Sequence, residues 1–149
     1  GSWDDQWGSS DGTESSLILK DGGDIKPAEG YYKLTMDTKK STLKMEKVDI
    51  TPATYTTMGI IGLNGDWDND IVMTQFAAAV NPHLWSASIE VAADTECKFR
   101  AEGAWDNNWG ATEFPYGVGT NGGANIPVKA GNYTVVFNDI NGSYTFISK

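Results

Sequence analysis

The sequence has little of the chemistry that most enzymes and nucleic-acid-binding proteins need. Its 149 residues include one cysteine, Cys97, so no disulfide can form within the chain, and we expect a buried, unreactive thiol. Arginine and histidine each occur once, as Arg100 and His83, and the formal net charge is −9. An acidic chain without a basic cluster is a poor match for nucleic acid. No hydrophobic run approaches the length of a membrane span.

Two catalytic arrangements can be weighed against the residues that are present. A Ser-His-Asp triad would need His83, which follows an Asn-Pro turn and has no nucleophile motif beside it. Glycosidase carboxylates could come from Glu102, Asp106 and Glu113, near a turn rich in tryptophan. A module of about one hundred residues offers a shallow face rather than a deep cleft, and surface carboxylates are common in an acidic chain. The sequence therefore predicts a protein that is not an enzyme and has no catalytic residues.

One loop has part of a calcium-binding pattern. Residues 66–70 alternate Asp with other residues in the D-x-D-x-D spacing of an EF-hand. Ile71 stands where the EF-hand has Gly, and Ala77 stands where it has the bidentate Glu. These departures exclude an EF-hand, and we predict no metal and no cofactor. The sequence leaves two interpretations of this loop open: a site for a single calcium ion, and a solvated turn.

What the sequence does contain is the pattern of short strands and tight turns. Leu84–Val91 alternates apolar and polar residues, with Trp85 on the apolar side and so in the core. The other strand candidates are residues 55–63, 71–76, 96–102, 133–138 and 143–147, the last two joined by an Asn-Gly turn. No segment has a sustained helical period. The sequence therefore predicts an all-β protein, an antiparallel immunoglobulin-like β-sandwich.

An internal repeat with a period of about one hundred residues organises the chain. The matching segments are 3–8 with 105–110, 21–25 with 121–126, 30–37 with 131–138, and 43–45 with 144–146. Residues 1–48 are thus expected to be the C-terminal half of a truncated preceding module, and residues 49–149 a complete module. Residues 47–54 form a short, stiff linker containing Pro52. The half module is expected to expose an apolar face made of Leu34, Met36, Leu43 and Met45.

Residues 98–110 run from a short strand into a polar turn that carries two tryptophans. We expect Trp109 to pack in the core, and Trp105 to be exposed because it lies among turn-forming residues without apolar alternation. Trp67 lies in a similar Asp/Asn turn and is also expected to be exposed. Lys98, on the polar side of its strand, can reach a sugar hydroxyl, whereas Asn125 is either an amide ligand or a turn former. Flat apolar rings beside amides and cations are typical of a carbohydrate site.

Three ordered motifs carry a family resemblance. They are the Trp-containing run at 98–110, the Gly-Gly-x-Asn-Ile run at 122–126 and the Ala-Gly-x-Tyr-x-Val run at 130–135. Together they resemble the repeated modules of the SusE/SusF family of outer-membrane lipoproteins from Bacteroidetes, over residues 55–149 and, for the tail of the preceding module, 3–48.

The resemblance implies a noncatalytic protein that holds polysaccharide at the cell surface through tandem modules. By this resemblance Trp67 and Trp105 are the aromatic platforms, Lys98 is the cation and Asn125 is the amide of the glycan site. The half module keeps Trp3 and Asp24 but lacks the strand and loop for the other ligands, and it is not expected to bind glycan alone.

The function implied is binding of starch or another α-glucan on the extracellular face of the outer membrane. The partners would be a polysaccharide or oligosaccharide and outer-membrane glycan-uptake proteins, with membrane attachment only through a lipid anchor absent from this chain. Two alternatives stay open: a structural spacer with buried tryptophans, and a binder of another glycan such as xylan.

Overall fold

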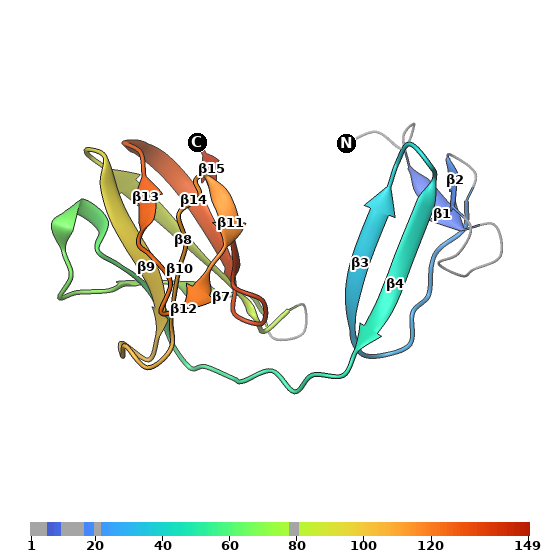
Figure 1. Ribbon diagram of the computed structural model, residues 1–149, viewed down its shortest axis with the longest axis horizontal. Helices are drawn as coiled ribbons and strands as arrows, with labels where there is room; N and C mark the ends of the chain where they lie inside the picture. Colours follow the sequence, from blue (N-terminus) through green and yellow to red (C-terminus); the bar gives the residue numbers. More distant parts are fainter. Residues whose placement is uncertain (1–5, 10–16, 20–21, 78–80) are drawn as a thin grey trace. The chain divides into compact units, whose positions relative to one another are not determined.

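The computed structural model describes residues 6–9, 17–19, 22–77 and 81–149, with residues 17–19 described by their backbone alone. The chain divides into two compact units, Gly1–Thr51 and Pro52–Lys149. Each unit is built from antiparallel strands (Figure 1). In the described part of the chain, no helix is long and apolar enough to cross a membrane.

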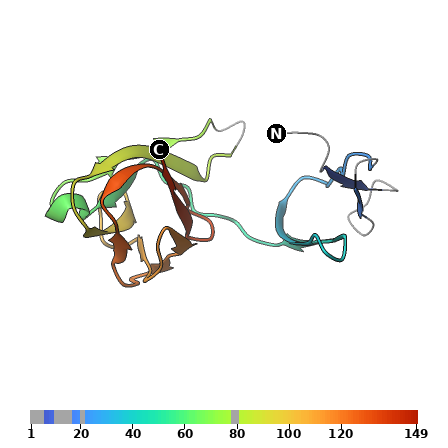
Figure 2. The ribbon, with the colours of Figure 1, turned by 90° about the horizontal axis from the view of Figure 1, so that it is seen from above.

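The second unit consists of two antiparallel sheets whose inner faces pack together (Figures 1 and 2). One sheet has the strand order β12-β10-β9-β5-β6, and β13 pairs with the first residues of β9, before the part of β9 that pairs with β10. The other sheet has the order β11-β15-β14-β8-β7. The strands are β5 (Met58–Ile61), β6 (Ile71–Val72), β7 (Thr74–Gln75), β8 (Leu84–Val91), β9 (Thr95–Ala101), β10 (Asn108–Gly110), β11 (Tyr116–Val118), β12 (Thr120–Asn121), β13 (Ile126–Val128), β14 (Gly131–Asn138) and β15 (Ser143–Ser148). The prediction of an antiparallel, immunoglobulin-like β-sandwich is confirmed.

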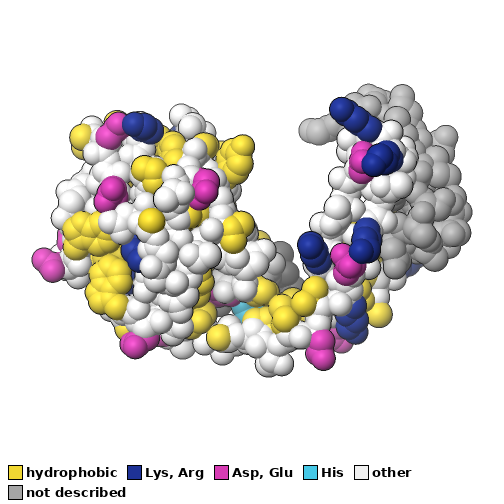
Figure 3. Space-filling model, in the orientation of Figure 1, with side chains coloured by type: hydrophobic (Ala, Val, Ile, Leu, Met, Phe, Trp, Pro, Cys, Tyr) yellow, Lys and Arg dark blue, Asp and Glu magenta, His cyan; other side chains and the backbone are white. Residues whose placement is uncertain are grey.

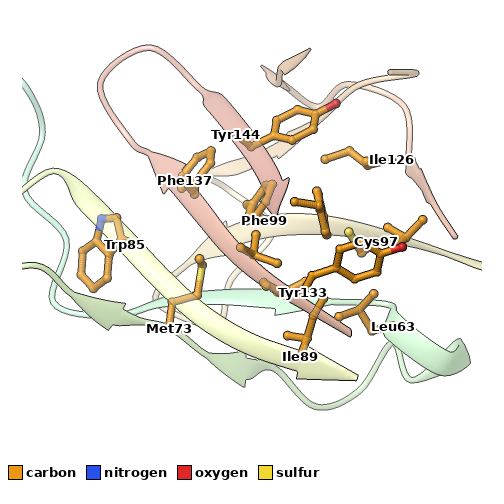
Figure 4. Packing of buried hydrophobic residues seen from close by; sticks show 14 of the residues in the cluster. Leu63, Met73, Trp85, Ile89, Cys97, Phe99, Ile126, Tyr133, Phe137 and Tyr144 are labelled. Carbon is orange, nitrogen blue, oxygen red and sulfur yellow. The ribbon is translucent and has the colours of Figure 1, made fainter. Parts of the chain in front are cut away.

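The core lies between the sheets and is built on stacked aromatic rings (Figure 4). Phe99 of β9 stacks on Phe137 of β14 with ring centroids 4.4 Å apart and an interplanar angle of 11°. Trp85 is buried, as predicted, and its indole Nε1 donates a 2.7 Å hydrogen bond to Asp139. The same carboxylate lies 2.7 Å from Nδ1 of the buried His83. His83 and Trp85 thus share one buried carboxylate.

The buried thiol of Cys97 also belongs to this core. Burial raises its pKa to about 12, because a thiolate without water or a cation is strongly disfavoured. The expected burial of Cys97 is confirmed.

Strand boundaries differ from the sequence prediction at two places. The single strand predicted for residues 71–76 is two short strands, because the chain changes sheets at the buried Met73: β6 pairs with β5, and β7 pairs with β8. The strand predicted for residues 55–63 shortens to β5, since Gly62 adopts the left-handed conformation with φ 96° and starts the 3₁₀ helix η2 (Leu63–Gly65). The predicted turn at 105–110 ends earlier, because Asn108–Gly110 form β10.

The first unit holds two hairpins, β1 (Trp7–Ser9) with β2 (Leu17–Leu19) and β3 (Tyr31–Asp37) with β4 (Thr42–Val48). In the second hairpin Leu34 lies opposite Met45, and Met36 opposite Leu43, so these four apolar residues share one face. Leu34 and Met36 are exposed, and the other two are half-buried. Trp3, named in the sequence comparison, lies outside the described residues.

Candidate functional site: an aromatic platform on the outer face of one sheet

The site is organised by β9, whose side chains alternate between the two faces of its sheet. Cys97, Phe99 and Ala101 are buried in the core. Successive residues of a strand point to opposite faces, so Lys98 and Arg100 lie on the outer face. Local alternation therefore places both basic residues of this strand on the face that also carries the exposed tryptophans.

Trp67 and Trp105 come from different loops and meet over this face. Their ring centroids are 6.3 Å apart and their planes make an angle of 29°. Carbon atoms in direct contact are about 3.5–4 Å apart, so the rings are offset rather than superposed. Trp67 is 36% exposed and Trp105 is 49% exposed, which agrees with their expected exposure. The pair forms a bent apolar surface open to solvent, and in Figure 3 hydrophobic surface adjoins a dark blue basic side chain on the side of the unit that carries β9.

The loop that carries Trp67 is held against the end of β5. A Cβ at Gly62 would lie 2.6 Å from the Trp67 ring, so only glycine lets the indole pack this closely on the backbone. The Asp66 carboxylate accepts hydrogen bonds from the backbone amides of Asp68 and Asn69, at 3.0 and 2.9 Å. These bonds lower the pKa of Asp66 and fold the loop into an Asx turn.

Trp105 is supported by Arg100. The guanidinium carbon lies 4.9 Å from the centroid of the Trp105 ring, a cation–π contact. Its Nε donates a 2.8 Å hydrogen bond to Asp70, and both side chains of this ion pair are largely buried, with 8% and 16% exposed. Asp70 in turn packs over Gly59, where a Cβ would lie 2.7 Å from the Asp70 Cβ. Arg100 therefore lies against the indole of Trp105, which stays 49% exposed.

Asn108 fixes the turn that carries Trp105. It lies opposite Arg100 on β10, is 7% exposed, and its Nδ2 donates a 2.7 Å hydrogen bond to the Trp105 carbonyl. Its Oδ1 accepts no hydrogen bond from the described residues. A buried amide that bonds the backbone of a turn restricts how the side chain of that turn can move.

Lys98 lies on the outer face, two residues before Arg100, and opposite Ile61 of β5. It is 9% exposed, and burial lowers the pKa of its amine. Its stem passes close to Gly110, where a Cβ would lie 2.9 Å from Cε of Lys98. Lys98, expected on the polar side of its strand, thus lies on the outer face of the sheet but is largely buried there.

Asn125 precedes β13 and points toward the other end of β9. Its Nδ2 donates a 2.9 Å hydrogen bond to Glu96, which lies two residues before Lys98 on the same face. From Glu96 to Arg100 the strand rises about 13 Å at about 3.3 Å per residue. Along the outer face of β9, Asn125 thus lies at the Glu96 end, Lys98 lies in the middle, and the Arg100–Trp105 contact lies at the other end.

Glu102, one of the carboxylates considered for catalysis, is bonded within the protein. Glu102 accepts hydrogen bonds from the backbone amides and hydroxyls of Thr56 and Thr57, at 2.6 to 3.4 Å. These bonds lower the pKa of Glu102, the opposite of what a general acid needs.

Trp109, expected in the core, packs against the core, with its ring centroid 5.3 Å from that of Phe137.

In the loop with the calcium-like spacing, two of the three aspartate side chains bond within the protein. Asp66 bonds its own turn and Asp70 pairs with Arg100. Among the residues that the structure describes, no group of three or more His, Cys, Asp or Glu side chains could hold a metal ion.

Sequence reasoning missed three residues of the site: Arg100, Asp70 and Asn108. Arg100 could have been found, because alternation places it beside Lys98 and it is the single arginine of the chain. The ion pair with Asp70 and the turn contact of Asn108 depend on pairing between strands that are distant in sequence. No local pattern reports such contacts.

Comparison with known proteins bears on the fold. No family model matches the sequence, and no curated protein matches it. The solved structure of SusF from Bacteroides thetaiotaomicron is similar, with a TM-score of 0.55 and 16% sequence identity over 70% of this chain and 27% of that chain. The chain thus spans about a quarter of the length of SusF. At this identity the likeness shows a shared fold: the chain has the antiparallel β-sandwich architecture of a part of SusF.

Proposed function

We propose that the unit Pro52–Lys149 is a noncatalytic glycan-binding module. The observation that carries this proposal is the offset pair of half-exposed indoles, Trp67 and Trp105, on the outer face of a β-sandwich. Large exposed aromatic rings mark a binding surface in a small soluble unit. Their faces fit the C–H side of a pyranose, and the neighbouring polar groups fit its hydroxyls.

The site residues in this proposal are Trp67, Trp105, Lys98 and Asn125, with Arg100 as the support of the platform. Two stacked rings contribute about 1–3 kcal/mol each, by analogy with stacking of bases on aromatic side chains. Ordering a flexible oligosaccharide offsets part of this free energy. A single module should therefore bind with a Kd of about 10 μM to 1 mM.

Starch or a related α-glucan is the proposed ligand, and the extracellular face of the outer membrane is the proposed location. The motif resemblance to the SusE/SusF family and the fold shared with SusF support both statements. In this setting the module would hold polysaccharide for outer-membrane glycan-uptake proteins.

Affinity electrophoresis of the chain in gels containing starch, xylan, β-glucan or mannan tests the proposal. Retardation by starch, lost in Trp105→Ala and kept in Tyr116→Ala, is the expected result. Tyr116 is the matched control because it is an exposed aromatic residue, at 70%, on an edge strand of the other sheet. Retardation by xylan and not by starch would identify xylan as the ligand. If none of the four polysaccharides retards the chain, the result would favour the structural spacer.

A further inference from the structure

Lys98 is a largely buried cation without a partner. Its side chain is 9% exposed, and among the described residues its amine makes no hydrogen bond and no ion pair. Burial lowers the pKa of this amine, and no carboxylate compensates for it. Arg100, buried two residues further along β9, is paired with Asp70. An uncompensated charge at this depth lowers stability, and such groups cluster at binding sites.

The stem of Lys98 is held by close packing on both sides. A Cβ at Gly110 of β10 would lie 2.9 Å from Cε of Lys98 and would clash with the carbonyl oxygen of Ala124. The absence of a Cβ at Gly110 thus lets the lysine stem lie close to this strand. On the other side, Ile61 of β5 lies opposite Lys98. The lysine is therefore restricted before a ligand arrives, which reduces the entropy lost on binding.

The amine of Lys98 is nevertheless accessible to a ligand. In the described part of the chain, Oδ1 of Asn108 is the one fully buried side-chain nitrogen or oxygen atom without a hydrogen bond. Because Nζ of Lys98 also lacks a hydrogen bond, Nζ must still touch solvent. A ligand can therefore reach this nitrogen without a rearrangement of the strand.

Lys98 lies beside both halves of the aromatic platform. Gly62 follows the residue opposite Lys98 on β5, and the Trp67 ring packs on its backbone. Arg100, which contacts Trp105, is two residues along the same face of β9, a step of about 7 Å. A glycan stacked on the platform therefore has substituents within reach of the amine.

The charge of Lys98 distinguishes neutral from anionic substituents. A ligand that covers the amine removes the water that remains on it. A neutral hydroxyl accepts a hydrogen bond but leaves the positive charge uncompensated, whereas an anionic group accepts the bond and compensates the charge. Hydrogen bonds between two ionised groups are also about twice as strong as neutral ones. The surroundings of Lys98 thus favour an anionic ligand group.

The acidic groups nearest along the strand are engaged elsewhere. Glu96, two residues before Lys98, is exposed and accepts a hydrogen bond from Asn125, and Asp70 is paired with Arg100. The net charge of −9 acts on a ligand mainly from a distance. At physiological ionic strength, charges more than about 8 Å apart are largely screened. Local pairing at Lys98 therefore outweighs the overall repulsion of an anion.

We propose that the glycan site contains an anion subsite at Lys98, which takes a carboxylate or phosphate group carried by the bound glycan. This inference rests on the proposed glycan-binding function and adds one substituent to its ligand. Two sources supply this chemistry: a uronic acid branch, as on glucuronoxylan, and a phosphate monoester, as on phosphorylated starch.

Calorimetry of the full chain with two matched pairs of oligosaccharides tests the subsite. One pair is maltotriose and its phosphate monoester, and the other is xylotriose and xylotriose branched with glucuronic acid. At about 0.15 M salt, the anionic member of one pair should bind about tenfold or more tightly than its neutral partner, the gain from one charge-assisted hydrogen bond. The pair that shows the gain identifies the source of the anion.

Variants of the chain locate the charge responsible. Lys98→Gln keeps hydrogen-bond donors without the charge, so both members of the pair should bind it equally. Lys98→Arg keeps the charge and should keep a preference for the anionic member. Lys129→Met is the matched control, because it changes the net charge as Lys98→Gln does, but at a lysine that is 67% exposed and paired with Asp94. The preference should persist in this control.

The possible failures separate this inference from the proposed function. Equal binding of both members of both pairs by the parent chain would overturn the anion subsite and leave glycan binding standing. A preference that survives in Lys98→Gln, or that Lys129→Met removes equally, would overturn the subsite because the charge would then act from elsewhere. Failure of all four oligosaccharides to bind would overturn both proposals.

Discussion

The guanidinium carbon of Arg100 lies 4.9 Å from the ring centroid of Trp105 and its Nε is bonded to Asp70, so a buried ion pair supports an exposed platform. Replacing Arg100 with Met leaves the Asp70 carboxylate without its cation. We expect unfolding free energy to fall by about 1–3 kcal/mol, measured by chemical denaturation, and starch binding to weaken as Trp105 loses its support. Arg100→Lys should recover part of the stability and less of the binding, because an ammonium lacks the planar fork.

An exposed ion pair is the control for that prediction. Lys129 and Asp94 are 2.7 Å apart, but their side chains are 67% and 60% exposed. Lys129→Met should leave the unfolding free energy nearly unchanged, because solvent screens an exposed ion pair, and it should leave binding unchanged. If Arg100→Met and Lys129→Met change stability and glycan binding by similar amounts, Arg100 does not support the platform.

The tryptophans of the core and of the platform should separate binding from stability. Trp105→Ala should lose most of the glycan binding in calorimetry while its melting temperature stays close to that of the parent chain. Trp85→Ala should lower the unfolding free energy by about 3–5 kcal/mol, since it empties the core and leaves the Asp139 carboxylate without its indole donor. Normal binding by Trp105→Ala, or its failure to fold, would mean that the turn is structural.

Lys98 should lower stability at neutral pH while supporting binding. Burial lowers its pKa below the usual 10.5, so between the folded and the unfolded pKa values the unfolded chain binds more protons. The parent chain is therefore expected to gain stability relative to Lys98→Met as pH rises through that window toward 10.5. At pH 7 Lys98→Met should melt at a higher temperature and bind glycan more weakly.

Thermal unfolding of both proteins from pH 7 to pH 11 measures this difference. A difference in melting temperature that does not change with pH would contradict the assignment of the destabilisation to the buried charge. Unchanged glycan binding in Lys98→Met would remove Lys98 from the site.

Glu102 should have no catalytic role. Its pKa is lowered by hydrogen bonds from Thr56 and Thr57, so it is deprotonated at neutral pH and its oxygens are occupied. Incubation with the polysaccharide that the chain binds should release no more reducing ends than a heat-inactivated sample. Activity that disappears in Glu102→Gln or Asp106→Asn would show that the protein is a glycosidase.

The sequence alone determined the fold class and the inner or outer position of many side chains. A strand has a period of two residues, so alternation in β8 and β9 separates Trp85 and Phe99 from Lys98 without reference to the rest of the molecule. Turn-forming residues around Trp67 and Trp105 likewise indicate exposure, because such segments offer no apolar face to bury. These properties depend on local interactions, which is why they can be read along the chain.

Only the tertiary structure decided that Trp67 and Trp105 adjoin and that Arg100, Asp70 and Asn108 support them. Their proximity arises from the antiparallel pairing of β9 with β5 and β10, and the register of that pairing has no local signature. The same reason explains the split of residues 71–76 between two sheets at Met73. A local pattern specifies which side of a strand a residue occupies, whereas contacts across strands specify which residues meet there.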